Sequence, residues 1–178
     1  YNPELARKYV KLFEEKYKNS PSIKLTTSSN YLDLCEFIQK ELEKLGIKLI
    51  IDVIPGSALK QAKANGKLDF FRASWIADYP DAENYMSLFY SKNLAPNGPN
   101  YTHFYNTDFD ILYENSLKET NPEKSKSLYS KMDSIIISKS VIVPLFYDEV
   151  VRFVSKDISG MKINATNLLD LRKVKKGN

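Results

Sequence analysis

The strongest constraint on the fold is an alternation of strand-like and helix-like patterns in the first half of the chain. Three runs rich in apolar and aromatic residues are typical of strands: Ile23–Ser28, Ile47–Ile54 and Leu68–Ile76. Apolar residues at helical spacing fill residues 31–45 between the first two, and Ser57–Ala64 predicts a short helix before the third. This order is typical of an α/β sheet with crossover connections. We therefore predict a β-α-β-α-β core, right-handed where the strands are parallel.

The second half of the chain has a different pattern, dominated by helices. Outside the core, helices are expected at Pro3–Lys18, Ala82–Tyr90, Asp108–Lys118 and Pro122–Lys139. The Asn-, Pro- and Gly-rich residues 92–106 predict a long loop. A late pair of strands is expected at Val141–Phe146 and Glu149–Ser155, and Pro144 indicates a sheet edge or a bend.

Composition excludes several classes of protein. The chain has 178 residues, of which 43% are hydrophobic and 27% charged, as in an ordinary soluble domain. The net charge of +4 lies mostly in the last seven residues, so we expect no nucleic-acid partner. A single cysteine excludes an internal disulfide. Because the chain begins with Tyr1 and shows no signal peptide, we expect a mature chain or, preferably, a piece of a longer protein.

The sequence offers little for catalysis, metals or cofactors. Cys35 and His103 stand apart, and a transition-metal site needs several ligands at fixed spacing. No P-loop, dinucleotide-binding or nucleophile-elbow motif is present. Cys35 lies beside the apolar stripe of a predicted helix, so a packed thiol is expected rather than a nucleophile. We expect a non-enzyme without metal or cofactor.

The segment LDFFRASWIADYPDAEN, residues 68–84, is the best candidate for a binding site. In open α/β sheets, ligands bind at the carboxyl ends of strands, where Trp75 and Asp78 are expected. An aromatic face beside a carboxylate suits a ligand ammonium group. The residues alone support equally well a core Trp75, with Asp78 capping the helix that begins near Ala82.

This segment and its neighbours resemble a known family. SWIADYPDAENYMSLFYS is similar to a stretch of the extracellular solute-binding proteins of peptide ABC transporters, the dipeptide- and oligopeptide-binding type, family 5. YNPELARKYVKLF and the strand-helix-strand with Leu45-Gly46-Ile47 resemble the pieces that precede it. The paired helices and Pro144-Leu145-Phe146 resemble those that follow. The resemblance covers about residues 1–163.

The resemblance implies a periplasmic-binding-protein-like lobe. Family members have two lobes joined by a hinge and enclose a peptide between them. Residues 1–163 would form most of the second, C-terminal lobe, and residues 164–178 would be a tail that returns to an absent first lobe. The implied role is capture of a dipeptide or oligopeptide for uptake, with a membrane permease as partner. The implied location is periplasmic or extracytoplasmic, with lipid anchoring of the full-length protein as one form.

The resemblance also implies ligand-binding residues. Asp78 matches the acid that holds the α-amino group of the peptide. Arg72 matches an arginine that faces the peptide carboxylate in oligopeptide binders. Trp75 matches the family tryptophan, and Tyr79 and Asp81 belong to the same stretch.

Two departures from the family pattern are mild. Ala82 stands where the family often has Pro, and Ser74 stands where it has Gly. Other functions stay open. The family also includes binders of nickel, haem and sugars. An α/β interaction domain without a ligand would bury Trp75 fully and bond Asp78 only to backbone. A carboxylate hydrolase would need Asp78 and Asp81 to face one cleft.

Overall fold

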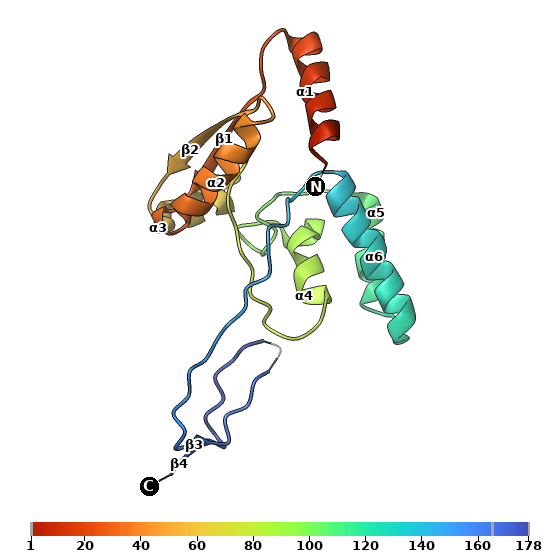
Figure 1. The fold of residues 1–178 in the computed structure, drawn as a ribbon. Coiled ribbons are helices and arrows are strands. Elements are labelled where there is room, and N and C mark those ends of the chain that lie inside the picture. The colour runs from red at the N-terminus through yellow and green to blue at the C-terminus, as the bar shows by residue number, and fades with distance from the viewer. Residues whose placement is uncertain (1, 165, 178) are drawn as a thin grey trace. The chain divides into compact units, whose positions relative to one another are not determined.

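The computed structural model describes residues 2–164 and 166–177. The chain divides into two compact units, which are described separately here (Figure 1). The first unit contains the residues up to 74 together with residues 94–103. The second unit contains residues 75–93 and the chain from 104 onward.

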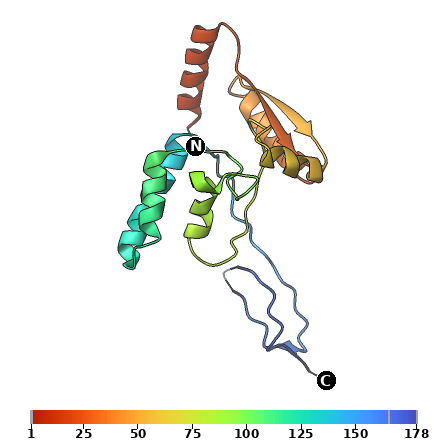
Figure 2. The same cartoon turned by 180° about the vertical axis from the view of Figure 1, so that it is seen from behind.

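A parallel pair of strands forms the centre of the first unit. β1 (Ser22–Thr27) pairs with β2 (Lys48–Val53), with Ser22 opposite Lys48 and Thr27 opposite Val53. α2 (Leu32–Glu43) connects the two strands and lies along them, as both views show (Figures 1 and 2). This arrangement confirms the predicted strand-helix-strand at nearly the expected bounds.

The core of the first unit lies between this sheet and α2. Leu25, Leu49 and Cys35 are buried together, and Cys35 is fully buried. The predicted packed thiol is therefore confirmed. A 3-10 turn at Ser29–Tyr31 precedes α2, and α3 (Gly56–Ala64) follows β2.

The predicted third strand, Leu68–Ile76, is wrong in its extent. Only Phe71 forms a bridge, to Thr26 of β1, in the parallel sense. The Thr26 amide donates to the Phe70 carbonyl at 3.0 Å, and the Arg72 amide donates to the Thr26 carbonyl at 3.1 Å. The pairing does not continue past Arg72, because β1 ends at Thr27 and the chain then turns into the 3-10 helix.

α1 (Pro3–Tyr17) begins with an asparagine cap, because Asn2 Oδ1 accepts a hydrogen bond from the Leu5 amide at 2.9 Å. Pro3 occupies the first helical position, as predicted. The helix ends at Lys18, whose φ of 59° is left-handed. Only Val10 is buried, so most of the predicted apolar stripe is exposed in this chain.

The second unit is mainly helical. It contains α4 (Glu83–Met86), 3-10 turns at Ser87–Phe89 and Ser91–Asn93, α5 (Thr107–Ser116) and α6 (Pro122–Ser138). The last two pack side by side (Figure 1). The asparagines before them are caps: Asn106 accepts from the Phe109 amide at 2.9 Å, and Asn121 accepts from the Glu123 and Lys124 amides.

One buried cluster holds the second unit together. Its members come from the 3-10 turn at Ser87–Phe89, from α5 and from α6: Phe89, Phe109, Tyr113, Met132 and Ile136. Polar contacts also tie residues 90–92 to α5. Ser91 donates from its amide to Asp110 Oδ1 at 3.1 Å, and Lys92 pairs with Glu114 at 2.7 Å. The chain that follows α4 is therefore fixed against α5.

The predicted bounds of the late strand pair are wrong. Residues 142–155 form neither helix nor strand. The structure instead pairs β3 (Ile158–Ser159) with β4 (Lys175–Lys176), in the antiparallel sense. A strand needs a neighbouring strand for its backbone hydrogen bonds, and residues 142–155 pair with no strand among the described residues. Tyr147 and Phe153 are accordingly 93% and 97% exposed.

Candidate functional site

The stretch from Trp75 to Asn84 lies in the second unit and folds around one amide. The side chain of Asn84, only 4% exposed, sits in the first turn of α4. Its Oδ1 accepts a hydrogen bond from the Trp75 indole Nε1 at 2.7 Å and one from the Asp78 amide at 3.3 Å. The tryptophan and the turn that follows it are therefore held by the same oxygen.

The Asp78 side chain is exposed. Among the described residues, that carboxylate accepts no hydrogen bond and forms no ion pair. Trp75 is half-buried. These observations do not match an interaction domain with a fully buried Trp75, nor an Asp78 that caps α4. The N–H group at the start of α4 is instead taken by Asp81, whose Oδ1 accepts from the Glu83 amide at 2.8 Å.

The side chains of Tyr79 and Asp81 both form hydrogen bonds within the protein. The Tyr79 hydroxyl donates to Glu83 Oε2, and the hydroxyl of Tyr113, from α5, donates to Glu83 Oε1. Besides the Glu83 amide, Asp81 Oδ1 accepts from the Tyr129 hydroxyl of α6 at 3.2 Å. Burial raises the pKa of Tyr113, and the Glu83 carboxylate raises it further. The hydroxyl therefore stays protonated and donates throughout the neutral range.

Arg72 lies in the first unit, so the structure does not place it relative to the four other predicted site residues. Its guanidinium carbon stacks 3.2 Å from the centre of the Tyr31 ring, and Nη1 donates to Ser74 Oγ at 3.1 Å. No carboxylate among the described residues pairs with Arg72. The stacked face leaves the edges of the guanidinium as hydrogen-bond donors.

A second cation lies close to Arg72 in the first unit. The Lys63 ammonium lies 5.7 Å from the centre of the Phe71 ring and 5.6 Å from that of Tyr101. Burial lowers the pKa of Lys63, and the charges of Arg72 and Lys60 lower it further. This part of the first unit therefore carries positive charge that no acidic side chain among the described residues neutralises by an ion pair.

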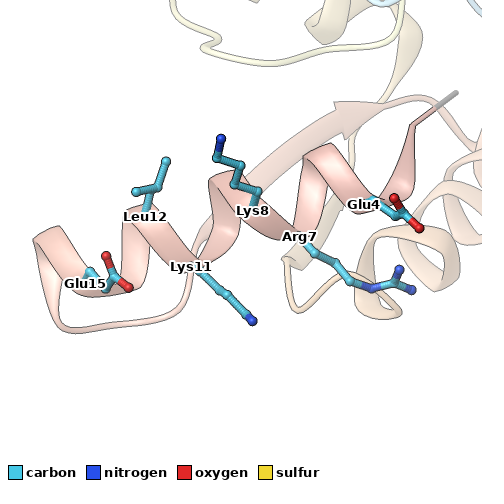
Figure 3. A pocket seen from close by; sticks show the side chains of 6 residues that line it. All are labelled: Glu4, Arg7, Lys8, Lys11, Leu12 and Glu15. Carbon is cyan, nitrogen blue, oxygen red and sulfur yellow. The ribbon is translucent and has the colours of Figure 1, made fainter.

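No predicted site residue lines either of the two hollows that stand out on the described surface. One hollow follows α1 alone, and its lining side chains are all exposed (Figure 3): Glu4, Arg7, Lys8, Lys11, Leu12 and Glu15. In Figure 3, Lys8 and Leu12 point to one side of the helix and Lys11 to the other, so they do not converge. The second hollow lies among residues 152–174. Neither offers an enclosed binding cavity.

The described residues contain no group of three His, Cys, Asp or Glu side chains arranged to hold a metal ion. In that same part of the chain, no helix is both long enough and apolar enough to cross a membrane. His103 is exposed and belongs to the first unit.

Asn84 and Glu83, which organise the loop, were not predicted to have a role. Asn84 falls inside the helix predicted at Ala82–Tyr90. Asn disfavours helix interiors because its amide competes with the backbone. That mismatch is a signal that the side chain has a specific partner elsewhere. The sequence does not identify these partners, because the residues between Trp75 and α4 form no regular helix or strand whose spacing would predict the contact.

Comparison with known proteins gives the family. Residues 1–97 match the family model described as bacterial extracellular solute-binding proteins, family 5 Middle. A glutathione-binding protein GsiB from Shigella dysenteriae is 28% identical over 172 residues, which cover 92% of this chain and 33% of that protein. The chain thus spans about a third of the length of this curated relative.

Solved structures agree with this result. The dipeptide-binding protein of Pseudoalteromonas sp. SM9913 in complex with Met-Leu is 25% identical, with a TM-score of 0.78 over 99% of this chain and 36% of that one. The Escherichia coli murein tripeptide binding protein MppA has the same fold, with 18% identity and a TM-score of 0.80 over 97% of this chain and 35% of that one. The predicted α/β periplasmic-binding-protein-like class is confirmed. The chain belongs to the bacterial extracellular solute-binding proteins, family 5.

Proposed function

We propose that the protein carrying this chain captures short peptides for uptake by an ABC transporter, and that Asp78 anchors the peptide amino terminus. The observation that carries the proposal is the uncommitted Asp78 carboxylate beside the half-buried Trp75. A carboxylate and an ammonium group form a charge-assisted hydrogen bond. An adjacent indole face adds a cation–π contribution.

The chemistry of the relatives supports this ligand class. One relative is named for glutathione binding, one solved structure holds Met-Leu, and another is named for a murein tripeptide. All three ligands are short peptides. A free amino terminus is the cation that most short peptides share.

The remaining features of the proposal follow from family membership. Residues 1–163 would contribute to the second lobe of a two-lobed protein, and residues 164–178 would return to the first lobe. Arg72 would face the ligand carboxylate with the guanidinium N–H groups that Ser74 does not accept from. Tyr79 and Asp81 would act mainly by holding the loop, since their polar groups are engaged. The permease of the transporter would be the membrane partner, and the location would be extracytoplasmic.

Closure of the lobes would strengthen the proposed ion pair. Excluding water lowers the local dielectric and raises the Coulomb energy of a close pair. Removal of one partner from a buried pair typically costs about 3–5 kcal/mol, because the other charge is left uncompensated. Loss of the Asp78 charge should therefore weaken peptide binding by about 100-fold or more.

Calorimetric titration of the full-length gene product tests the proposal. The titrant is a pool of alanine peptides of two to five residues, alongside the same pool with acetylated amino termini. Binding should be lost on acetylation and on the Asp78→Asn substitution. Asp133→Asn, an exposed acid on α6, is the matched control and should bind as the wild type does. Equal binding of the free and acetylated pools would show that Asp78 is no amine anchor.

A further inference from the structure

We propose that Asn84 is the positioning residue of the amine site, because a single buried oxygen sets the place of both Trp75 and the Asp78 backbone. This inference rests on the proposed function. It assigns a role that neither the family match nor the relatives' names contain. Asn84 touches no ligand in this proposal; it acts through the two residues that do.

Asn84 Oδ1 is the shared hydrogen-bond acceptor of two donors in the loop. An amide oxygen has two lone pairs, and both are used: one for the Trp75 indole at 2.7 Å and one for the Asp78 amide at 3.3 Å. Since Asn84 is 4% exposed, water does not easily replace it as acceptor. The indole plane and the start of the Asp78 side chain are therefore fixed relative to each other.

Asn84 is itself fixed to the core of the second unit. The Asn84 backbone amide donates to the Asp81 backbone carbonyl at 3.2 Å, and the Asn84 backbone carbonyl accepts from Ser87 Oγ at 2.9 Å. The neighbouring Glu83 is held by the hydroxyl of Tyr113, which is buried in α5. A chain of contacts thus runs from the helical core through α4 to the Asp78 backbone.

The physical consequence is a preorganised carboxylate. A side chain held in its bound position before the ligand arrives loses less conformational freedom on binding. Without an acceptor at residue 84, the indole and the Asp78 turn would each sample other positions, and binding would have to order them. We expect a loss of about 10- to 100-fold in affinity, smaller than the loss from Asp78→Asn.

The acceptor oxygen of Asn84 is the atom on which the proposed positioning role depends. Asn84 Oδ1 alone accepts from the Trp75 indole and the Asp78 amide, while the Asn84 side chain also hydrogen-bonds the Tyr79 hydroxyl. Asn84→Asp keeps an acceptor oxygen of the same shape. Asn84→Leu keeps the branching of the side chain at Cγ and removes the acceptor. The first variant should therefore bind within about threefold of the wild type, and the second should show the loss.

The experiment uses the full-length gene product and the alanine peptide pool. The variants are Asn84→Leu, Asn84→Asp, Asp78→Asn and the double variant Asn84→Leu/Asp78→Asn. Asn106→Leu is the matched control, because it removes one asparagine acceptor, the cap of α5, in the same unit. It should lower thermal stability without changing peptide affinity at a temperature where the protein is folded.

Three results together support the proposal: loss in Asn84→Leu, rescue in Asn84→Asp, and no further loss from Asn84→Leu once Asp78 is Asn. The third result distinguishes positioning from general damage, because a structural defect would add to the loss of the charge. Wild-type affinity in Asn84→Leu, or additive losses in the double variant, would overturn it.

Hydrogen exchange of the wild type provides a test that needs no variant at residue 84. The Trp75 indole N–H and the Asp78 amide N–H should both exchange more slowly than in a short peptide, with the indole assigned by its absence in Trp75→Phe. Fast exchange at both groups would overturn the role of Asn84. Failure of the proposed function has a different signature: the wild type would bind free and acetylated pools alike.

Discussion

The bond between Glu83 and Tyr113 gives a quantitative prediction about how the candidate loop is held. Tyr113 is 5% exposed, and its hydroxyl donates to the Glu83 carboxylate. Hydrogen bonds to charged groups contribute about 1.5–3 kcal/mol, and a buried donor left unpaired costs about 1–3 kcal/mol. The second donor, Tyr79, is 45% exposed, so solvent screening makes its contribution small.

These magnitudes give the changes in the free energy of unfolding that we expect in a double-mutant cycle of Glu83 and Tyr113. Glu83→Leu should destabilise by about 2–3 kcal/mol, because the buried Tyr113 hydroxyl loses its acceptor. Tyr113→Phe should cost about 1–2 kcal/mol, because the exposed side of Glu83 can be hydrated. In the double variant the unpaired hydroxyl is absent, so the coupling energy should be about 1.5 kcal/mol.

Urea unfolding followed by tryptophan fluorescence measures these values. Trp75 is the single tryptophan of the chain and lies in the same unit as Glu83 and Tyr113, so its emission reports on that unit. Tyr85→Phe is the matched control, since Tyr85 also belongs to α4 but its hydroxyl makes no hydrogen bond with described residues. A coupling energy below about 0.5 kcal/mol between Glu83 and Tyr113 would show that their hydrogen bond does not stabilise the loop.

Three further predictions concern the same unit and use the same urea assay. Met132→Ala should cost about 2–5 kcal/mol because Met132 is fully buried, whereas Ile137→Ala, 45% exposed, should cost less than about 1 kcal/mol; equal costs would contradict the assigned core. Burial raises the pKa of Tyr113, so its stabilising contribution is complete below about pH 10 and is lost as the pH rises through the raised value. Tyr113→Phe should therefore lose stability less steeply than the wild type above about pH 10, and parallel curves would contradict this reasoning. Asp78→Asn should change stability by less than about 0.5 kcal/mol, because the carboxylate has no partner among the described residues; a larger loss would assign it a structural role.

Local signals in the sequence predicted the helices well. Pro3 and Pro122 at first helical positions mark helix starts that the structure confirms. The asparagine caps of α1 and α5 were not predicted. Each signal depends on residues within one turn, so no knowledge of the rest of the fold is needed. The parallel pair β1 and β2 was predictable for a similar reason, since α2 between them forces a crossover.

The strand errors have a common cause, because pairing depends on a neighbour that the local pattern does not contain. Residues 68–76 have strand composition, yet only Phe71 forms a bridge to β1, at Thr26. Residues 142–155 have strand composition as well and lie without a neighbouring strand in the described chain. A strand-like pattern therefore predicts that a segment can be extended, and does not predict that it is paired.

The candidate site shows the same limit at the level of single side chains. Asp78, Asp81 and Glu83 are three acids within one short stretch, and composition cannot tell them apart. The fold separates them by their donors: Asp81 accepts from the Glu83 amide and from α6, and Glu83 accepts from two tyrosines. Only the Asp78 carboxylate is left without a donor among the described residues.

An acid with internal donors contributes to stability, because its unfolding breaks charge-assisted hydrogen bonds. An acid without them contributes little to stability and keeps its full capacity to accept from a ligand. Asn84 makes this separation possible, because it holds the Asp78 backbone by the amide and leaves the carboxylate untouched. The position of the proposed anchor is thus fixed through the main chain, while its charge stays available. A ligand ammonium group would then meet a carboxylate that is already placed and has no internal partner to give up.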